Sequence, residues 1–182
     1  MVHNNKKLFT GLALLAVVVV PAALGVRFYR SLPAEPLSVG IVVPQFDVEP
    51  VASATALPRE GRRVLFFFSP SCPHCEETLL QFGQMRDAHP EWFSGDRGLK
   101  WIFISTAGKD ETTAFAEAAS WPVYYDAERR AMKSLRGVTV PYLVLVNEDG
   151  LVQYRHNGGR GLSQQEALIG MFYQTGTPPD LR

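Results

Sequence analysis

The sequence predicts an α/β domain whose sheet is covered by helices, and three observations support that prediction. Residues 64–68 are five consecutive apolar side chains bounded by Ser69 and Pro70, the pattern of a strand buried on both faces. A helical pattern follows directly, and a second apolar run comes at 101–105. Strands and helices that alternate in this way are typical of three-layer α/β/α folds.

Length and composition allow one such domain with an extension. The chain has 182 residues, of which 46% are hydrophobic and 20% charged, enough for an ordinary core. Its formal net charge is zero, although every charged residue among the first 30 is basic. Because the rest of the chain has no excess of positive charge, we expect no nucleic-acid partner.

The N-terminal region contains an apolar stretch, Leu8–Val26, without a charged residue. This length suffices for a helix to cross a hydrocarbon core of about 30 Å. Lys6 and Lys7 would mark the cytoplasmic side. The alternative is a signal peptide that is cleaved near Ala23-Leu24-Gly25. In either case the soluble part is exported, to the periplasm if the anchor lies in a bacterial inner membrane.

The predicted organisation therefore has five parts. They are a cytoplasmic tail at 1–7, a transmembrane anchor or signal peptide at 8–26, a linker at 27–40, a folded domain at 41–176 and a tail at 177–182. The linker and the first residues of the domain are rich in proline. Pro44 and Pro50 restrict any strand there to a sheet edge, because proline cannot donate to a strand ladder.

The domain's remaining elements follow from periodicity. After the strand at 64–68, apolar residues at 79, 80, 82 and 85 predict a helix. The sequence then predicts a loop at 89–98, a strand at 101–105, a helix at 110–119, a strand at 123–125 and a helix at 127–135. Two strands follow, joined by a turn at 148–150. A capping box at 163–166 opens a last helix, with Leu168, Met171 and Phe172 in the core.

The predicted reactive residues are Cys72 and Cys75, which are the only cysteines and are spaced C-x-x-C. They lie where the first core strand meets a helix N-terminus, whose free N–H groups and partial positive charge stabilise a thiolate. Cys72 is the predicted attacking thiol and Cys75 the more buried partner in a reversible dithiol. Pro73 suits the first helical position, and His74 can add positive charge beside Cys72.

Other uses of the cysteine pair have less support. A structural zinc site needs a second pair of ligands, yet the other histidines are scattered. Haem attachment needs a histidine at position 76, which is Glu76. Two buried structural thiols remain a simple alternative. A copper-binding metallochaperone could use both sulfurs as soft ligands, although no methionine or histidine cluster lies near them.

The strand, the Cys-Pro-His-Cys tetrapeptide and the helix resemble the active site of the thioredoxin superfamily. The surrounding chain resembles the membrane-anchored TlpA/ResA group, because a helix and a strand are inserted before Pro141. This resemblance implies a thioredoxin-like three-layer α/β/α fold with an N-terminal hairpin that begins near 43–48. It also implies a cis peptide bond at Pro141, with Val140 presenting backbone groups to an extended client segment.

Two positions depart from the thioredoxin pattern. Ser71 stands where thioredoxins have a tryptophan, and Phe66 stands where they have a buried acid that assists the second cysteine. Glu76 and Glu77 are expected to face solvent in the first helical turn. No residue is therefore an obvious proton acceptor for Cys75.

The resemblance implies a membrane-tethered thiol–disulfide oxidoreductase with protein clients and no bound cofactor or metal. A membrane-embedded redox partner would reset the dithiol. The architecture favours a reductase, for example in cytochrome c maturation. The Pro73-His74 dipeptide instead resembles that of dithiol oxidases, because a stabilised Cys72 thiolate makes the disulfide more oxidising. The direction of exchange stays open on sequence alone.

Overall fold

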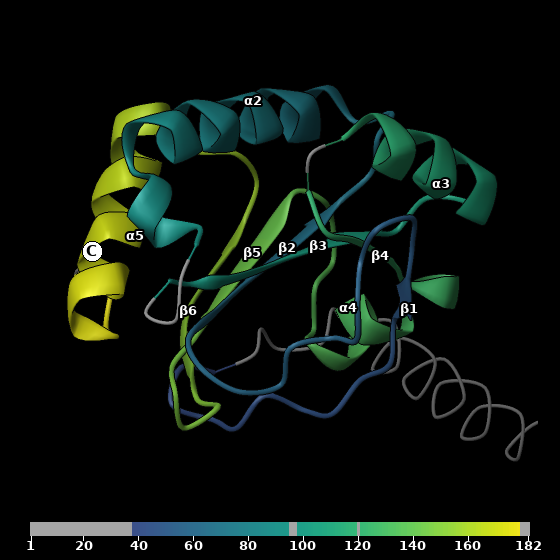
Figure 1. The fold of residues 1–182 in the computed structure, drawn as a ribbon. Coiled ribbons are helices and arrows are strands. Elements are labelled where there is room, and N and C mark those ends of the chain that lie inside the picture. The colour runs from purple at the N-terminus through teal and green to yellow at the C-terminus, as the bar shows by residue number, and fades with distance from the viewer. Residues whose placement is uncertain (1–37, 95–97, 120, 179–182) are drawn as a thin grey trace, which may run out of the picture. The chain divides into compact units, whose positions relative to one another are not determined.

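The computed structural model describes residues 38–94, 98–119 and 121–178, which form a mixed β-sheet with helices packed against it (Figure 1). Its strands are β1 (Glu49–Pro50), β2 (Arg63–Phe68), β3 (Lys100–Ser105), β4 (Val123–Tyr125), β5 (Tyr142–Val146) and β6 (Val152–Asn157). They are ordered β1-β4-β3-β2-β5-β6 across the sheet. β2, β3 and β4 are parallel to one another, whereas β1, β5 and β6 are antiparallel to their neighbours.

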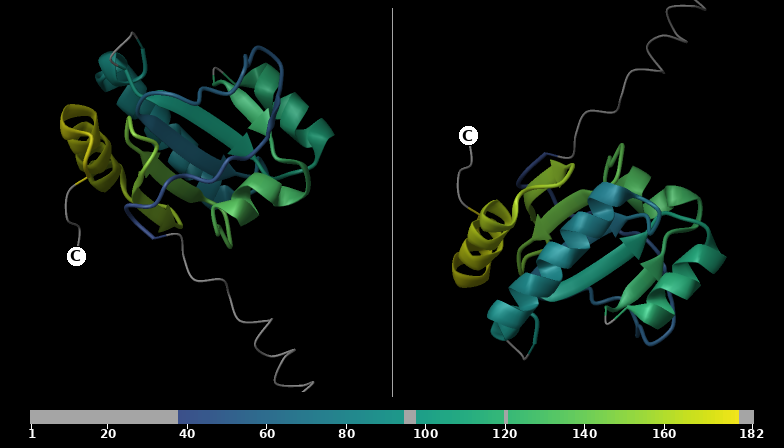
Figure 2. Two further views of the ribbon diagram at one scale, coloured as in Figure 1. Left: turned by 90° about the horizontal axis from the view of Figure 1, so that it is seen from below. Right: turned by 90° about the horizontal axis from the view of Figure 1, so that it is seen from above.

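The helices cover the two faces unequally. They are α2 (Pro73–Ala88), α3 (Lys109–Ala118), α4 (Arg130–Ser134) and α5 (Leu162–Thr175), with 3-10 turns at Pro90–Trp92 and Ala127–Arg129. Residues of α2, α3 and α5 share one core cluster with the sheet, and α2 crosses in front of the sheet in the right-hand view of Figure 2. α4 and the segment at 43–57 cover the other face.

The central strand β2 explains the unbroken apolar run. Val64, Phe66 and Phe68 belong to the core cluster under α2, whereas Leu65 and Phe67 belong to the cluster under α4. All five side chains are almost completely buried. Because alternate residues of a strand face opposite sides, a strand covered on both faces must be apolar at every position.

The predicted N-terminal hairpin is wrong. β1 pairs with β4, with Glu49 opposite Tyr125, and the segment before it makes only an isolated bridge between Val42 and Leu151. The apolar side chains of 43–48 pack on the sheet face that α4 also covers, so burial rather than hairpin pairing fixes this segment. Pro50 does lie at the sheet edge, as predicted.

The last helix also differs from its prediction in two respects. α5 begins at Leu162 with Gly161 as N-cap and makes no side-chain cap, so the capping box does not form. Glu166 instead bonds to His89, with 2.7 Å between Oε1 and Nε2. Leu168 and Phe172 are fully buried as predicted, whereas Met171 is 43% exposed and is not a core residue.

The predicted helix at 127–135 is interrupted. Glu128 and Arg129 have φ of 57° and 58°, left-handed values that end the 3-10 turn before α4 begins. Asp126, which is buried, accepts hydrogen bonds from the backbone N–H groups of Ala131 and Met132. This carboxylate therefore holds the start of α4 across the interruption.

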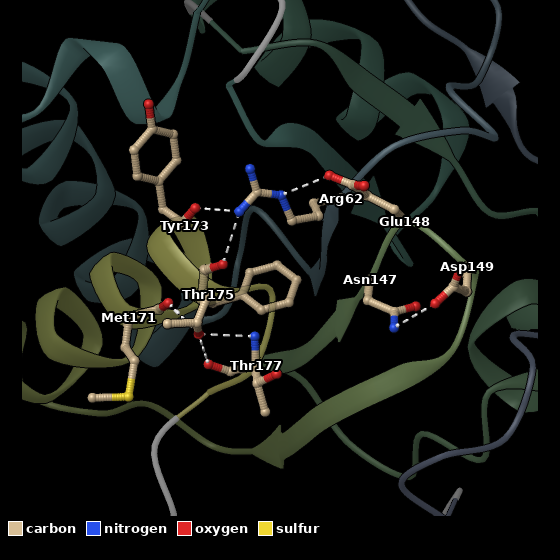
Figure 3. Close-up of polar contacts among 9 residues, drawn as sticks. Arg62, Asn147, Glu148, Asp149, Met171, Tyr173, Thr175 and Thr177 are labelled. Carbon is tan, nitrogen blue, oxygen red and sulfur yellow. Dashed lines mark hydrogen bonds and ion pairs between the residues drawn. The ribbon is translucent and has the colours of Figure 1, made fainter.

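Arg62 joins the end of α5 to the start of β2 (Figure 3). Its guanidinium donates to the backbone carbonyl oxygens of Phe172 and Tyr173 and lies 3.4 Å from Glu148 Oε1. The last carbonyl groups of a helix have no partner within the helix, so a cation there completes the C-terminal cap.

The transmembrane prediction falls outside the part of the chain that the structure describes. Leu8–Val26 belongs to the residues not described, and among the described ones no helix is both long and apolar enough to span a bilayer.

Candidate active site

The two cysteines lie at the junction of β2 and α2. Cys72 is the N-cap residue of α2, with an extended backbone, and Pro73 occupies the first helical position. The carbonyl oxygen of Cys72 accepts the N–H groups of Cys75 and Glu76 at 2.9 and 3.0 Å. Pro73 has no N–H to leave unpaired, so the sequence allows the helix to begin immediately after Cys72.

The two sulfur atoms have different surroundings. Cys72 is partly exposed, whereas Cys75 has no exposed surface and packs in the core cluster under α2. Burial, together with a hydrogen bond to Cys72, raises the pKa of the Cys75 thiol from 9.0 to about 12. Cys75 is therefore a neutral thiol at physiological pH, and Cys72 is the sulfur that an external disulfide can reach.

The residues between and after the cysteines face solvent. His74 and Pro73 are exposed, as are Glu76 and Glu77, whose orientation agrees with the prediction. The backbone carbonyl of His74 accepts a hydrogen bond from Thr78 Oγ1 at 2.8 Å. His74 thus presents its imidazole outward while its peptide group is held within the first turn.

A cis peptide bond joins Val140 to Pro141, as the family resemblance implies. Tyr142, the next residue, pairs with Phe67 of β2, so this bond lies beside the strand end that leads to Cys72. Val140 and Cys72 are both partly buried and pack against the same core cluster. The Val140–Pro141 bond and the cysteines therefore lie at the same end of the paired internal strands β2 and β5.

The core beneath the cysteines is aromatic. Phe66 is buried and its ring makes an edge contact with Phe82, at 5.0 Å between centroids. An apolar ring thus occupies the position where the resemblance implies an acid in thioredoxins. Such surroundings disfavour the Cys75 thiolate by desolvation, which agrees with the direction of its pKa shift.

The sequence prediction missed the segment after β6. Gly158–Gly161 resembles a flexible turn in sequence, yet Gly158 donates its N–H to the carbonyl oxygen of Pro141 at 2.7 Å. A Cβ placed on Gly159 would lie 3.4 Å from Thr78 Oγ1 and 4.0 Å from the carbonyl oxygen of His74. This short loop therefore contacts both parts of the site. The glycine pair was its only signal in the sequence.

A metal site receives no support from the described residues. Among them, no group of three or more His, Cys, Asp or Glu side chains is arranged to hold a metal ion. The two sulfurs are the soft ligands that the described part of this site offers.

Comparisons with known proteins agree with this geometry. The model of the AhpC/TSA family matches residues 39–155. Sporulation thiol-disulfide oxidoreductase A of Bacillus subtilis (strain 168) is 25% identical over 105 residues, or 54% of this chain. The match spans 61% of that relative's own length, which is less than two thirds.

Solved structures share the fold at lower identity. A secreted Mycobacterium tuberculosis disulfide oxidoreductase, homologous to E. coli DsbE, aligns with a TM-score of 0.50 and 17% identity, over 61% of this chain and 81% of its own. A thioredoxin-like protein solved in its oxidized form aligns with a TM-score of 0.58 and 18% identity. The alignment covers 76% of this chain and 97% of that protein. These likenesses identify the fold as thioredoxin-like.

Proposed function

Because the chain belongs to the AhpC/TSA family and has a thioredoxin-like fold, we propose that it is a protein thiol–disulfide oxidoreductase acting through Cys72 and Cys75. The observation that carries the proposal is the difference between the two sulfurs. One is accessible at a helix N-terminus, and the other is buried beside it with a raised pKa. The curated relative, itself named a thiol-disulfide oxidoreductase, supports the same activity.

In the reductive direction, the Cys72 thiolate attacks one sulfur of a client disulfide. The client S–S bond breaks, its other sulfur leaves as a thiolate that takes up a proton, and a mixed disulfide forms. Cys75 then gives up its proton and attacks the Cys72 sulfur. This step releases the second client thiol and leaves a Cys72–Cys75 disulfide, so two electrons pass from the dithiol to the client.

The surface beside Pro141 would supply the means of binding a client. Val140 precedes the cis bond, and Val138 nearby is 63% exposed. An extended client segment can pair with the backbone of Val140 as an added strand and bring its sulfur to Cys72. Pro73 and His74 are exposed next to Cys72 in the chain and would tune its reactivity.

The cellular setting is part of the proposal. Leu8–Val26 would anchor the chain in a bacterial inner membrane, with the folded domain in the periplasm and a membrane-embedded partner that restores the dithiol. Reduction of apocytochrome c thiols is one fitting role. An uncleaved anchor predicts that the protein stays in the membrane fraction after a carbonate wash and retains its N-terminus. A soluble form that begins near Val26 would establish cleavage instead.

Trapping of clients tests the exchange reaction. Cys75→Ala removes the resolving thiol, so it should accumulate mixed disulfides between Cys72 and client proteins, detectable on non-reducing gels. Cys72→Ala lacks the attacking thiol and is the matched control, which should accumulate none. Capture by both variants, or by neither, contradicts the proposed cycle.

The direction of exchange is tested separately. Equilibration of the full chain with glutathione buffers gives its reduction potential. A potential close to the −270 mV of thioredoxin supports a reductase. A value near −120 mV, as in a strong dithiol oxidant, would assign the chain to disulfide formation.

A further inference from the structure

The loop Gly158–Gly161 connects the cis-proline segment to the first turn of α2. Its Gly158 N–H binds the carbonyl oxygen of Pro141, and Gly159 lies close to Thr78 and the His74 carbonyl. Gly158 has a φ of +92°, a conformation that side-chain-bearing residues rarely adopt. The backbone of this loop is therefore shaped to fit between the two parts of the active site.

Gln165 fixes the loop from the α5 side. This residue is 3% exposed, and its Nε2 donates to the carbonyl oxygen of Arg160 at 2.8 Å. The same Nε2 donates to Oε1 of Gln81 in α2 at 2.7 Å. One buried amide group thus joins α5, the loop and the helix that carries the cysteines.

The side chain of Arg160 folds back onto β6. Its Nη2 lies 3.4 Å from Nδ1 of His156, and its guanidinium lies over the ring of Tyr154, 5.7 Å from the centroid. Arginine can only donate hydrogen bonds, so Nδ1 of His156 must be the acceptor. The hydrogen bond between Arg160 and His156 therefore requires His156 to be neutral, with its proton on Nε2.

The groups that act on His156 come from several elements. Arg160 faces it from the loop, Tyr154 lies beside it on β6, and the backbone of Gly159 bonds to its ring. α2 presents Thr78 and the His74 carbonyl to the same loop, and α5 presents Gln165. Burial first, and then the charge of Arg160, lowers the pKa of His156 from 6.5.

The polar atoms around the loop are not all hydrogen-bonded. Arg160 Nε and Gln165 Oε1 are buried and have no hydrogen-bond partner among the described residues. Each unpaired polar atom costs free energy, so the loop can be released more easily than a fully bonded one.

We propose that Arg160 and Gln165 are positioning residues that hold the first turn of α2 against the cis-proline segment, and that protonation of His156 releases this hold. The inference rests on the proposed thiol–disulfide exchange and names a means by which pH regulates it. A protonated His156 cannot accept from Arg160 and places a second positive charge against the guanidinium. The pKa of His156 is lowered from its usual value of 6.5. The contact between Arg160 and His156 is therefore complete above about pH 6.5 and is lost as the pH falls through the lowered pKa.

The first experiment compares the full chain with His156→Asn, whose side chain cannot become charged. The rate constant for reduction of oxidised glutathione by the reduced protein is measured from pH 5 to pH 7.5. Ionisation of Cys72 affects both proteins, so the ratio of the two rate constants isolates His156. We expect a ratio near one at pH 7.5 and an advantage of about three- to tenfold for His156→Asn at pH 5, the range of one or two hydrogen bonds. A ratio that does not change with pH overturns the inference.

The second experiment detects the contact between the loop Gly158–Gly161 and α2 without any thiol–disulfide exchange. In ¹H–¹⁵N NMR spectra of the reduced full chain, the backbone amide signal of Gly159 and the side-chain amide signals of Gln165 should shift together between pH 7.5 and pH 5, and should shift much less in His156→Asn. If they shift while the protein reduces no disulfide, the proposed function fails and the coupling stands. If they do not shift, the coupling fails whatever the activity.

A third comparison tests Gln165 itself. Gln165→Met removes the amide that joins α2 to the loop, and Gln164→Met is the matched control on an exposed position of the same helix. We expect Gln165→Met to change the equilibrium constant with glutathione at pH 7.5 by about three- to tenfold, and Gln164→Met to leave it unchanged. A folded Gln165→Met with the unaltered constant contradicts a positioning role. Thermal melts establish that each variant is folded.

Discussion

The backbone N–H of Cys75 donates to the carbonyl oxygen of Cys72 at 2.9 Å, and the side chain of Cys75 is completely shielded from solvent. This relationship assigns different properties to two residues of the same type that lie three positions apart. The partly exposed sulfur can meet a client, and the buried one can meet only its partner. The alkylation rates of the two thiols and the pH dependence of the free energy of unfolding should both differ as this arrangement predicts.

Selective alkylation is the first expected outcome. In the reduced protein near pH 6, iodoacetamide should modify Cys72 and leave Cys75 almost unmodified, because a buried neutral thiol is a poor nucleophile. Mass spectrometry of peptides after timed quenching measures both rates. The Cys72→Ala variant reports the rate of Cys75 alone. Equal rates, or faster labelling of Cys75, would reverse the assignment of attacker and resolver.

The raised pKa of Cys75 predicts how stability depends on pH. The unfolded thiol ionises near 9.0 and the folded one near 12, so the folded state favours the protonated form. This contribution is complete below pH 9 and is lost as pH rises toward 12. The free energy of unfolding of the reduced protein should therefore fall above pH 9.

Urea unfolding of the reduced protein at pH 8 and pH 10 measures this loss. Other groups also titrate in that range, so Cys75→Val serves as the control. The decline between the two pH values should be smaller in the variant. The same decline in both proteins would show that Cys75 is not the cause.

We expect His74 to raise the reduction potential of the Cys72–Cys75 pair. A positive imidazole beside Cys72 stabilises the thiolate, which exists only in the reduced state. Replacing it by His74→Leu should weaken the reduced form and move the potential to more negative values. A tenfold change in the thiol–disulfide equilibrium corresponds to about 30 mV for this two-electron couple.

Glutathione equilibration at pH 6 measures the His74 effect, and His74→Gln separates charge from polarity because it removes only the charge. Both variants should shift in the same direction. His74 is exposed, so solvent screens its charge and the shift should be modest. A potential that does not move, or that becomes more positive, eliminates this role.

Gly170 in α5 should be intolerant of a side chain. A Cβ at this position would lie 2.8 Å from the indole ring of Trp92, which is buried and cannot move aside easily. Gly170→Ala should lower the free energy of unfolding by about 1–2 kcal/mol despite the better helix propensity of alanine. Gly83→Ala in α2 is the control, because no atom lies within 4 Å of its Cβ position. That change should raise stability by about 0.5–1 kcal/mol, as chemical denaturation can measure.

Local patterns in the sequence were sufficient to predict the centre of the fold. The apolar run 64–68 predicts β2 because a strand buried on both faces has no position for a polar side chain. The position of Cys72 at the start of α2 follows from the same junction. The cis bond at Pro141 was predicted by the resemblance to the family, and it is present.

The errors arose where distant segments decide the structure. In the sequence, Gln165 looks like part of a helix cap. In the structure it lies on the same face of α5 as Leu168 and is buried. It can be buried there because Oε1 of Gln81, far away in the chain, accepts a hydrogen bond from its side-chain amide. The helical pattern also predicts Met171 in the core, although this residue lies outside that face. The family resemblance likewise predicts an N-terminal hairpin, because no local signal indicates that β1 pairs with β4.

Arg62 binds the last carbonyl groups of α5 at the N-terminal end of β2, and the cysteines follow the opposite end of that strand. A fusion partner joined after Pro178 would therefore leave the domain on the side away from the dithiol. A fluorescent reporter or a surface tether attached there should leave Cys72 open to large clients. The domain is thus suited to use as an immobilised reagent or as the sensing part of an optical redox probe.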